Sequence, residues 1–238
     1  MDALGPALVS LAAAGIGITP TARASIDGHV RLLLAWNEAI NLTAITDPAA
    51  VARLHVADSL AALPLLQHLT LATVLDLGSG GGFPGLTLAA VMPALRVTLV
   101  ESVAKKAAFL ETAVAALGLS ARVDVVNARA EALLPGVWDV VLARAVGGLA
   151  ELIELSLPLL APGGSLLAWK RGDITAELAA GGRAAVALGG GRPTLEPHPT
   201  GLATAAGILG HVIVRVRKDA PTPAGYPRDR PARLRGPW

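Results

Sequence analysis

A glycine-rich segment carries the clearest chemical signal in the chain. Val74–Gly85 reads VLDLGSGGGFPG, a short apolar run that leads into closely spaced glycines. Because glycine has no Cβ, such a segment lets a ligand touch the backbone directly. Gly80, Gly82 and Gly85 also satisfy the G-x-G-x-x-G spacing of dinucleotide-binding loops, so the spacing alone is compatible with more than one nucleotide cofactor.

The carboxylate of Asp76, near the end of that apolar run, favours one kind of cofactor. Dinucleotide loops hold a pyrophosphate at a helix N-terminus, where a nearby carboxylate would repel it. A methionine-derived methyl donor instead carries a sulfonium and an ammonium group, which a carboxylate attracts. The segment therefore favours S-adenosylmethionine over a nicotinamide or flavin dinucleotide, and a purely structural glycine turn is the remaining alternative.

Two further segments fall where an open α/β sheet binds ligands. Glu101 ends the second apolar run, 23 positions after Gly78. An acid at about this place in such folds accepts hydrogen bonds from the two ribose hydroxyls of a cofactor. A solvated charge at the end of a strand is the alternative. Asn127–Glu131 follows the third apolar run, and we expect it to contact the adenine.

The fourth apolar run ends at Leu142–Ala145, where enzymes that methylate exocyclic amines usually carry a short acidic or amide residue followed by Pro-Pro-aromatic. That tetrad is absent, and without cysteine the covalent route to a pyrimidine carbon is closed. Direct in-line transfer to an atom with a free lone pair, such as a purine ring nitrogen, remains, and proximity supplies most of its catalysis. Arg144 would orient the acceptor or line the cofactor pocket; a structural arginine paired with a buried carboxylate is the alternative.

Basic residues flank the same expected sheet edge. Lys105 and Lys106 follow the second run, and Lys170 and Arg171 follow the fifth, so that a phosphate backbone could bridge them. Taken singly, each pair is compatible with solvated surface. The last 28 residues hold seven basic and two acidic residues, and we expect two of the basic ones to contact RNA as well: Arg215 and Arg228.

The elements that position these residues alternate along the chain. Residues 1–70 have a helical pattern, 71–219 alternate between apolar runs and helical stretches, and 220–238 form a basic, proline-rich tail with little expected regular structure. Such alternation predicts an α/β fold, a mostly parallel sheet with helices on both faces. Residues 181–191 are expected to be loop-rich. The expected strands are Thr73–Leu77, Arg96–Val100, Val123–Asn127, Trp138–Ala143, Ser165–Trp169 and a late strand at His211–Arg217.

Composition excludes several classes of protein. At 238 residues the chain can bury one substantial core, and the lack of cysteine excludes disulfides and thiolate chemistry. Charge, glycine or proline interrupts every long apolar stretch, so we expect no membrane span, and Met1–Leu4 lacks the basic start of a secretory signal. We therefore expect a cytoplasmic protein. Aromatic residues make up 3%, which argues against a stacking platform for single strands.

Several motifs together resemble one known family, the bacterial small-subunit ribosomal RNA guanine-N7 methyltransferases, also called glucose-inhibited division protein B. The likeness spans most of the chain. It rests on these segments: Trp36-Asn37, Asn41–Ile45, His55 with Asp58-Ser59-Leu60, Asp76–Gly85, Glu101-Ser102 with Lys105-Lys106, Ala130-Glu131, Arg144-Ala145, Leu167–Lys170 and Tyr226-Pro227-Arg228.

The resemblance implies a Rossmann-like class I methyltransferase with a seven-stranded sheet, a monomer that needs no metal. It implies S-adenosylmethionine as cofactor and, as target, a guanine N7 in the decoding-site (530) loop of 16S ribosomal RNA, free or in the small subunit. The alternatives are a methyltransferase for a small molecule or protein, and a non-catalytic RNA-binding factor. The residues implied or expected to contact the cofactor are Asp76, Gly78, Gly80, Phe83, Glu101, Ser102, Ala130, Glu131 and Arg144.

The sequence departs from the family pattern in three places. Gly210 precedes His211 where an arginine is expected, and Leu54 stands in place of a basic residue before His55. Both departures remove charges that the resemblance would assign to RNA contacts. The chain ends in Arg235–Trp238 rather than in a lysine and Pro-Leu, so the tail is the least certain part of the likeness.

Overall fold

Seven strands form one sheet in the computed structural model, which describes residues 5–13, 15–70, 72–144, 147–236 and 238. The strand order is β3-β2-β1-β4-β5-β7-β6, and β1 to β5 run parallel while β7 runs antiparallel to its neighbours. The start of the chain, residues 1–4, and Ala145 lie outside the described residues. The strands are β1 (Thr73–Leu77), β2 (Arg96–Val100), β3 (Val123–Val126), β4 (Trp138–Arg144), β5 (Leu160–Arg171), β6 (Thr194–Pro197) and β7 (His211–Arg217).

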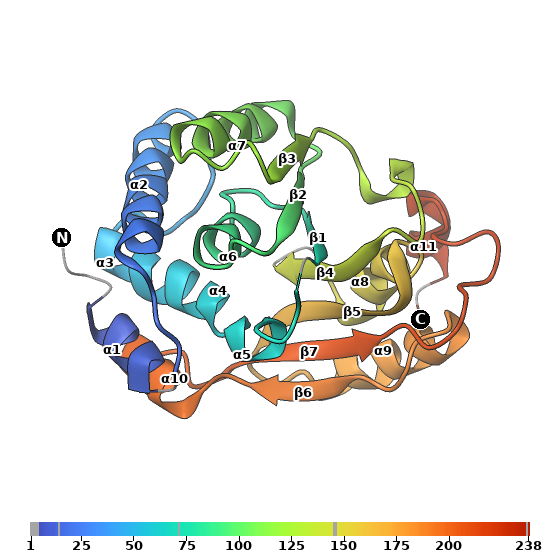
Figure 1. Ribbon diagram of the computed structural model, residues 1–238. Coiled ribbons are helices and arrows are strands. Elements are labelled where there is room, and N and C mark those ends of the chain that lie inside the picture. The colour runs from blue at the N-terminus through green and yellow to red at the C-terminus, as the bar shows by residue number, and fades with distance from the viewer. Residues whose placement is uncertain (1–4, 14, 71, 145–146, 237) are drawn as a thin grey trace.

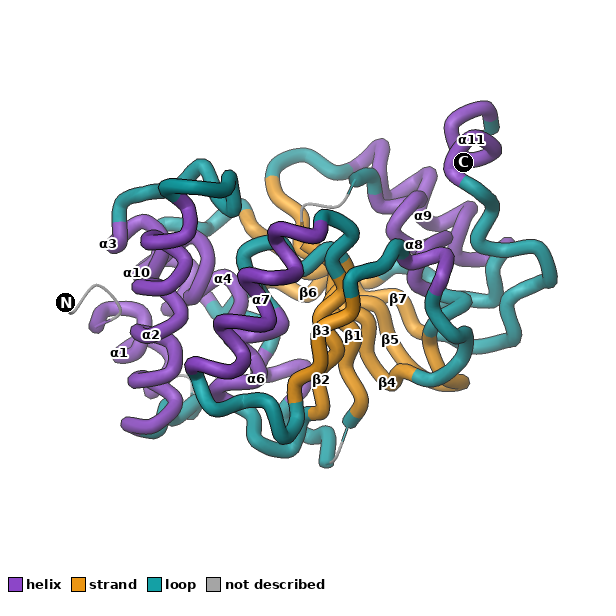
Figure 2. The backbone as a smooth tube through the Cα atoms, turned by 90° about the horizontal axis from the view of Figure 1, so that it is seen from above, coloured by secondary structure: helices purple, strands orange, loops and turns teal. Residues whose placement is uncertain are grey.

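Helices cover both faces of the sheet, so the molecule has three layers (Figure 2). On one face α6 and α7 pack on the sheet with α2 outside them, and on the other face α8 packs with α9. This arrangement confirms the expected α/β class. The helical elements are α1 (Gly5–Ala13), α2 (Pro20–Asn37), α3 (Pro48–Val51), η1 (Ala52–Ala57), α4 (Asp58–Leu60), α5 (Leu63–Leu66), α6 (Gly85–Val91), α7 (Ala104–Ala116), η2 (Ala130–Ala132), α8 (Leu149–Ser156), α9 (Thr175–Ala187), α10 (Thr200–Ala206) and α11 (Arg230–Arg235).

Strand β1 lies inside the sheet, between β2 and β4, and contributes to two hydrophobic cores. Its successive side chains point to opposite faces. Val74 belongs to the core under α2 and α6, whereas Leu75 and Leu77 belong to the core under α8 and α9. All three side chains are buried, which explains why a central parallel strand reads as an apolar run.

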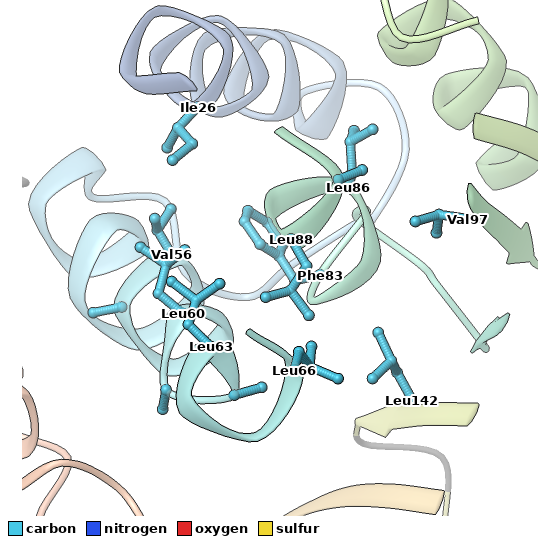
Figure 3. Packing of buried hydrophobic residues seen from close by; sticks show 14 of the residues in the cluster. Ile26, Val56, Leu60, Leu63, Leu66, Phe83, Leu86, Leu88, Val97 and Leu142 are labelled. Carbon is cyan, nitrogen blue, oxygen red and sulfur yellow. The ribbon is translucent and has the colours of Figure 1, made fainter. Parts of the chain in front are cut away.

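The helices before β1 share the first of these cores with the sheet (Figure 1). Thr19 caps α2 by accepting a hydrogen bond from the backbone nitrogen of Ala22, and Pro20 starts the helix. Ile26 and Leu33 of α2 are fully buried, which contributes about 1.5 to 3 kcal/mol each. Figure 3 shows Ile26 facing the same apolar space as side chains from α5 and α6.

The run Pro48–Leu66 contains α3, η1, α4 and α5. By length and composition it is apolar enough to cross a membrane, although the sequence predicts no such segment. Within the protein, 61% of its most apolar window is buried against other parts of the same chain. The apolar side chains of this run therefore belong largely to the protein core. The central stretch, η1, is a π-helix, a rare form that is frequent at functional sites.

The strands differ from expectation at β6, where no strand was expected, and at β5, which begins at Leu160 rather than at Ser165. Two helical segments differ as well. Residues 181–187, expected to be loop, belong to α9. A Cβ at Gly181 would come within 2.7 Å of Leu149 of α8, so this glycine lets the two helices pack closely. The tail, expected to lack regular structure, forms α11. Asp229 caps this helix by accepting a hydrogen bond of 2.7 Å from the backbone nitrogen of Ala232.

Candidate functional site

The parallel register brings the sequence-predicted segments together at one edge of the sheet. Leu77 at the end of β1 lies beside Val100 of β2 and Ala143 of β4. The glycine-rich loop, Glu101 and Arg144 follow these three positions directly. They therefore meet at the carboxyl edge of the sheet, where open α/β sheets bind their ligands.

The glycine-rich loop curls over the end of β2. Gly78 and Gly80 have φ angles of 72° and 51°, in the left-handed region that glycine adopts most easily. The backbone nitrogen of Gly78 donates to the carbonyl of Val100 at 2.9 Å. The backbone nitrogen of Gly80 donates to Oε2 of Glu101 at 3.0 Å. The loop is thus held by the neighbouring strand and by the acid at that strand's end.

Glu101 is 7% exposed and links two segments of the site. In addition to Gly80, it accepts a hydrogen bond of 2.8 Å from the backbone nitrogen of Val103 through Oε1. Asn127 donates through Nδ2 to the Glu101 carbonyl at 2.7 Å, a contact that fixes the third strand's end against the second. Each carboxylate oxygen retains a second lone pair, so Glu101 has the acceptor capacity for the ribose interaction expected from the sequence.

Asp76 is fully surrounded by the loop that follows it. Its Oδ2 accepts a hydrogen bond of 3.0 Å from the backbone nitrogen of Gly85, the first residue of α6. Burial raises the pKa of Asp76 to about 6, although that hydrogen bond opposes the rise. A Cβ at Gly85 would lie 2.7 Å from Oδ2 of Asp76. The carboxylate is therefore a support for the loop, in addition to any attraction it exerts on a cationic ligand.

Phe83 lies at the centre of a stack of rings. Its ring is 4.4 Å from that of His29 and 5.0 Å from that of His55, and the Arg144 guanidinium lies 5.4 Å from its centroid. His29 of α2 also lies 2.7 Å, through Nε2, from the carbonyl of Gly81. The ring of Phe83 is 5% exposed. It thus joins the helical N-terminal part to the glycine-rich loop.

Arg144 makes polar contacts with the run Pro48–Leu66. Its Nη1 lies 3.1 Å from Oδ2 of Asp58, and its Nη2 lies 3.2 Å from Nδ1 of His55. Burial and the charge of Arg144 lower the pKa of His55 to about 4. The side chain of Arg144 is 14% exposed. Arg144 therefore pairs with a buried carboxylate, as a structural arginine does. It also lies at the sheet edge where we expect the cofactor to bind.

Two histidines contact the other carboxylate oxygen of Asp58, Oδ1. Oδ1 lies 2.9 Å from Nε2 of His198 and 2.9 Å from Nδ1 of His211. Burial alone would raise the pKa of Asp58, but the hydrogen bonds from both histidines and the charge of Arg144 hold it well below its usual range. These interactions were not foreseen from the sequence, which singled out Asp58 and His211 only as motif residues.

Among the described residues, that same cluster has the spacing of a metal site. One ligand atom each from Asp58, His198 and His211 lies within 4.8 Å of the others. The guanidinium of Arg144, 3.1 Å from the second oxygen of Asp58, opposes a cation there by charge repulsion. Hydrogen bonds already satisfy the carboxylate, so we describe the cluster as a polar network.

The segment expected to contact adenine lies at the third strand's end. Ala130 is buried, and Glu131 lies 2.7 Å, through Oε1, from Nη2 of Arg233 in α11. Burial raises the pKa of Glu131, but the hydrogen bond from Arg233, a backbone hydrogen bond and the charges of Arg233 and Arg129 together lower the pKa overall. The C-terminal helix therefore contacts the expected cofactor edge, a tertiary contact between positions 102 residues apart.

The basic residues expected to bind RNA fall into two groups. Lys105 and Arg171 are exposed at the carboxyl edge, with Lys106 half-buried beside Lys105 and Ser102 exposed just before them. Lys170 forms an ion pair within the protein, because its Nζ lies 2.6 Å from Oε2 of Glu177. These four basic residues follow β2 or end β5, so they lie at the carboxyl edge of the sheet.

The other two lie elsewhere. Arg215 pairs with Leu167 in the strand register and its Nε donates to Ser165 at 3.4 Å, so it lies toward the opposite edge of the sheet. Arg228 pairs with the buried Glu154. Antiparallel β7 thus carries Arg215 away from the expected RNA surface. The tail instead holds Arg228 against α8, where its backbone carbonyl accepts a hydrogen bond from Arg233, the partner of Glu131.

Two hollows in the surface lie away from the carboxyl edge. One, of about 810 Å³, is a largely apolar depression between α9 and β6, with Arg183 and Arg192 in its lining. The other, of about 440 Å³, lies at the amino edge of the sheet and includes Asp139 and Arg215. Neither is lined by the glycine-rich loop or Glu101.

Comparison with solved structures agrees with the topology. A crystal structure of a predicted O-methyltransferase from Agrobacterium tumefaciens matches with a TM-score of 0.53 at 25% identity, over 69% of this chain and 81% of that one. The cyclase SpnF matches with a TM-score of 0.56 at 19% identity, over 87% and 98% of the two chains. The fold is thus the Rossmann-like class I methyltransferase fold, as expected. Because one neighbour is named a cyclase, the fold alone does not decide the chemistry.

Sequence comparison is more specific. A family model described as rRNA small subunit methyltransferase G matches residues 23–194. Ribosomal RNA small subunit methyltransferase G of Sorangium cellulosum is 48% identical over 174 residues, which cover 71% of this chain and 72% of that protein. The protein of the same name from Moorella thermoacetica is 37% identical over 219 residues, covering 90% and 89%. This chain therefore belongs to the rRNA small subunit methyltransferase G family, as the sequence motifs indicated.

Proposed function

We propose that this protein transfers a methyl group from S-adenosylmethionine to N7 of a guanine in the decoding-site loop of 16S ribosomal RNA. The observation that carries the proposal is the convergence of the glycine-rich loop, buried Glu101 and Arg144 at one sheet edge, in a chain of this family. We further propose that it acts in the cytoplasm as a monomer and without a metal.

The residues at this edge suit the methyl donor. Gly78 and Gly80 leave the backbone open to a close-lying ligand, and Glu101 offers oxygen acceptors for two ribose hydroxyls. Ala130 and Glu131 stand at the place expected to contact adenine. When bound, S-adenosylmethionine supplies an electrophilic methyl group attached to a positive sulfur.

The chain's own residues need little further chemistry. N7 of guanine has a lone pair and no proton, so no general base is required for its attack. Orientation of the guanine and exclusion of water then supply most of the rate. We assign the orientation to Arg144, whose guanidinium donors stand at the end of β4 over Phe83. Lys105, Lys106 and Arg171 would contact phosphates.

The test is transfer of radiolabelled methyl groups from S-adenosylmethionine to small ribosomal subunits and to 16S RNA from a strain that lacks this methylation. We expect label in 7-methylguanosine after digestion to nucleosides. Arg144→Lys, expected to transfer methyl groups much more slowly, and Gly78→Asp are the matched variants. We expect Gly78→Asp to abolish cofactor binding by filling the close-approach site and adding charge. Label in another nucleoside, in protein only or in a small molecule would overturn the assignment.

The competing function is methylation of a small molecule or a protein at the same site. The two differ in their response to salt, because RNA binding releases counterions and weakens steeply as salt is added. Affinity for the methyl acceptor should therefore fall strongly between low and moderate salt. A flat response, with label that follows a protein or metabolite fraction, would favour the competing function.

A further inference from the structure

Three distant segments of the chain converge on the carboxylate of Asp58. Arg144 ends β4, His198 lies just before α10, and His211 starts β7. Both histidines lie beyond residues 23–194, the part matched by the family model. Trp169 of β5 adds a hydrogen bond of 2.8 Å from Nε1 to the backbone carbonyl of Asp58. The side chain of Asp58 is 4% exposed, so these contacts form away from water.

The two oxygens of Asp58 divide the contacts between them. Oδ1 faces His198 and His211 at 2.9 Å each, and Oδ2 faces Nη1 of Arg144 at 3.1 Å. A carboxylate has about four acceptor positions, so all three contacts can be made at once. The histidines thus restrain Asp58 on one side, and Asp58 restrains the arginine on the other.

An unrestrained arginine side chain carries about 2 kcal/mol of rotamer entropy, which opposes holding Arg144 in one position. Its guanidinium is fixed on three sides: by Asp58, by His55 at 3.2 Å and by the face of Phe83 at 5.4 Å. His55 is in turn 2.8 Å from the hydroxyl of Thr43. His55 and Asp58 belong to the run that contains the π-helix, which places both side chains beside the same guanidinium.

We infer that Asp58 is a positioning residue, which holds Arg144 at the cofactor edge and is itself held by His198 and His211. This inference rests on the proposed function, because it assigns Asp58 a role in the reaction through Arg144. In this arrangement the N-terminal helices and the β6-β7 region together complete a site whose cofactor loop lies in the central part of the chain. Removal of Asp58 would leave the backbone fold of the loop in place and let the guanidinium leave its position.

A double-mutant cycle tests the inference. The variants are Asp58→Asn, Arg144→Ala and the combination, with Asp124→Asn on the exposed face of β3 as the matched control. Asp58→Asn removes the charge and keeps the shape. We expect it to lower kcat for methyl transfer to 16S RNA by about 100-fold, the cost of a misplaced reacting group, with the KM for S-adenosylmethionine changed less than about threefold.

The decisive comparison is made in the background that lacks Arg144. If Asp58 acts through Arg144, the double variant is no slower than Arg144→Ala alone, since the two substitutions remove one interaction. If Asp58→Asn slows the Arg144→Ala enzyme by the same factor as it slows the wild type, Asp58 acts independently and the inference is wrong. The same holds if Asp58→Asn behaves like Asp124→Asn.

Substitutions of His211, whose side chain is 22% exposed, keep the test valid should Asp58→Asn fail to fold. The amide nitrogen of His211→Asn stands near the position of Nδ1 and can still donate to Asp58, whereas His211→Ala cannot. We expect His211→Asn to retain most of the kcat and His211→Ala to lose it. Equal loss in both variants would overturn the inference.

Failure of the proposed function is distinguishable from failure of this inference. If wild-type protein transfers no label to ribosomal RNA, the proposed function fails. The cycle is then measured as urea midpoints, where a non-additive pair shows that Asp58 still holds Arg144 and an additive pair refutes the coupling. If the wild type is active and the cycle in kcat is additive, the function stands and the positioning role falls.

Discussion

The guanidinium of Arg228 donates two parallel hydrogen bonds to the buried carboxylate of Glu154, from Nε to Oε1 at 2.9 Å and from Nη2 to Oε2 at 2.6 Å. The backbone nitrogen of Arg228 and Nε1 of Trp238 donate to the same carboxylate. Burial alone would raise the pKa of Glu154, but the hydrogen bonds from Arg228 outweigh it and lower the pKa. The tail is thus fastened to α8 through Glu154, and its Arg233 contacts Glu131 of η2.

We predict that Arg228→Ala destabilises the protein by about 3 kcal/mol, because it leaves a buried carboxylate without its charged partner. Urea unfolding measures the loss, and limited proteolysis should show earlier cleavage in the tail. Arg230→Ala removes an exposed charge of the same sign from the tail and is the control. Equal stability of the two variants, with weaker RNA binding only in Arg228→Ala, would instead identify Arg228 as an RNA contact.

Gly85→Ala should abolish cofactor binding and lower stability. The new Cβ would lie 2.7 Å from Cβ and Oδ2 of Asp76 and 2.7 Å from Leu99, so the start of α6 must move. Gly182→Ala is the matched substitution in α9, where the added Cβ meets open space, and it should stabilise the protein by up to about 1 kcal/mol. Calorimetry with S-adenosylmethionine and thermal unfolding check both. Unchanged affinity in Gly85→Ala would place the cofactor elsewhere.

Acidification should weaken the fold through His29. Burial lowers the pKa of His29 from 6.5 to about 4, so the unfolded chain takes up the proton at a higher pH than the folded one. Its contribution is therefore complete above pH 6.5 and lost as the pH falls toward 4, about 3 kcal/mol for a shift of this size. The pKa of Asp76 is raised to about 6, so its protonation stabilises the folded state as the pH falls from 6 to 4. This effect on stability opposes that of His29.

The check is urea unfolding of the wild type and His29→Gln at pH 7.5, 6, 5 and 4. The glutamine amide can still donate to the Gly81 carbonyl but does not titrate, so stability should depend less steeply on pH in this variant. His68→Gln, which replaces an exposed histidine, is the control. Parallel curves for His29→Gln and the wild type would show that His29 is not the group responsible.

Lys105→Ala should weaken RNA binding similarly for all sequences and reduce the slope of log affinity against log salt by about 1, the value for one lost phosphate contact. Arg215→Ala removes the same charge from the opposite side of the sheet and should leave the slope unchanged. Binding of 16S RNA at several salt concentrations measures both. If Arg215→Ala lowers the slope and Lys105→Ala does not, the RNA lies across the amino edge.

Local sequence was sufficient for the framework of the site. The apolar run ending at Leu77, the glycines after it and the acid at Glu101 are short-range features, and hydrophobic periodicity is itself set by neighbours a few residues apart. Parallel strands then place consecutive strand ends at one edge, which is why the convergence with Arg144 was predictable. Residues 181–187 were misread because alanine and glycine fill a close helix contact, and their small size hides the helical pattern.

The partners of these residues were decided by tertiary structure alone. Asp58 meets His198 and His211 across 140 and 153 positions of sequence, and Arg233 meets Glu131 across 102. Nothing local distinguishes a histidine that will face a buried carboxylate from one that will face water. Sequence by itself therefore determined which strand ends and loops meet at one edge of the sheet, since periodicity and glycine act locally. Only the packed chain determined which charges neutralise one another there, because those distances exist only after folding.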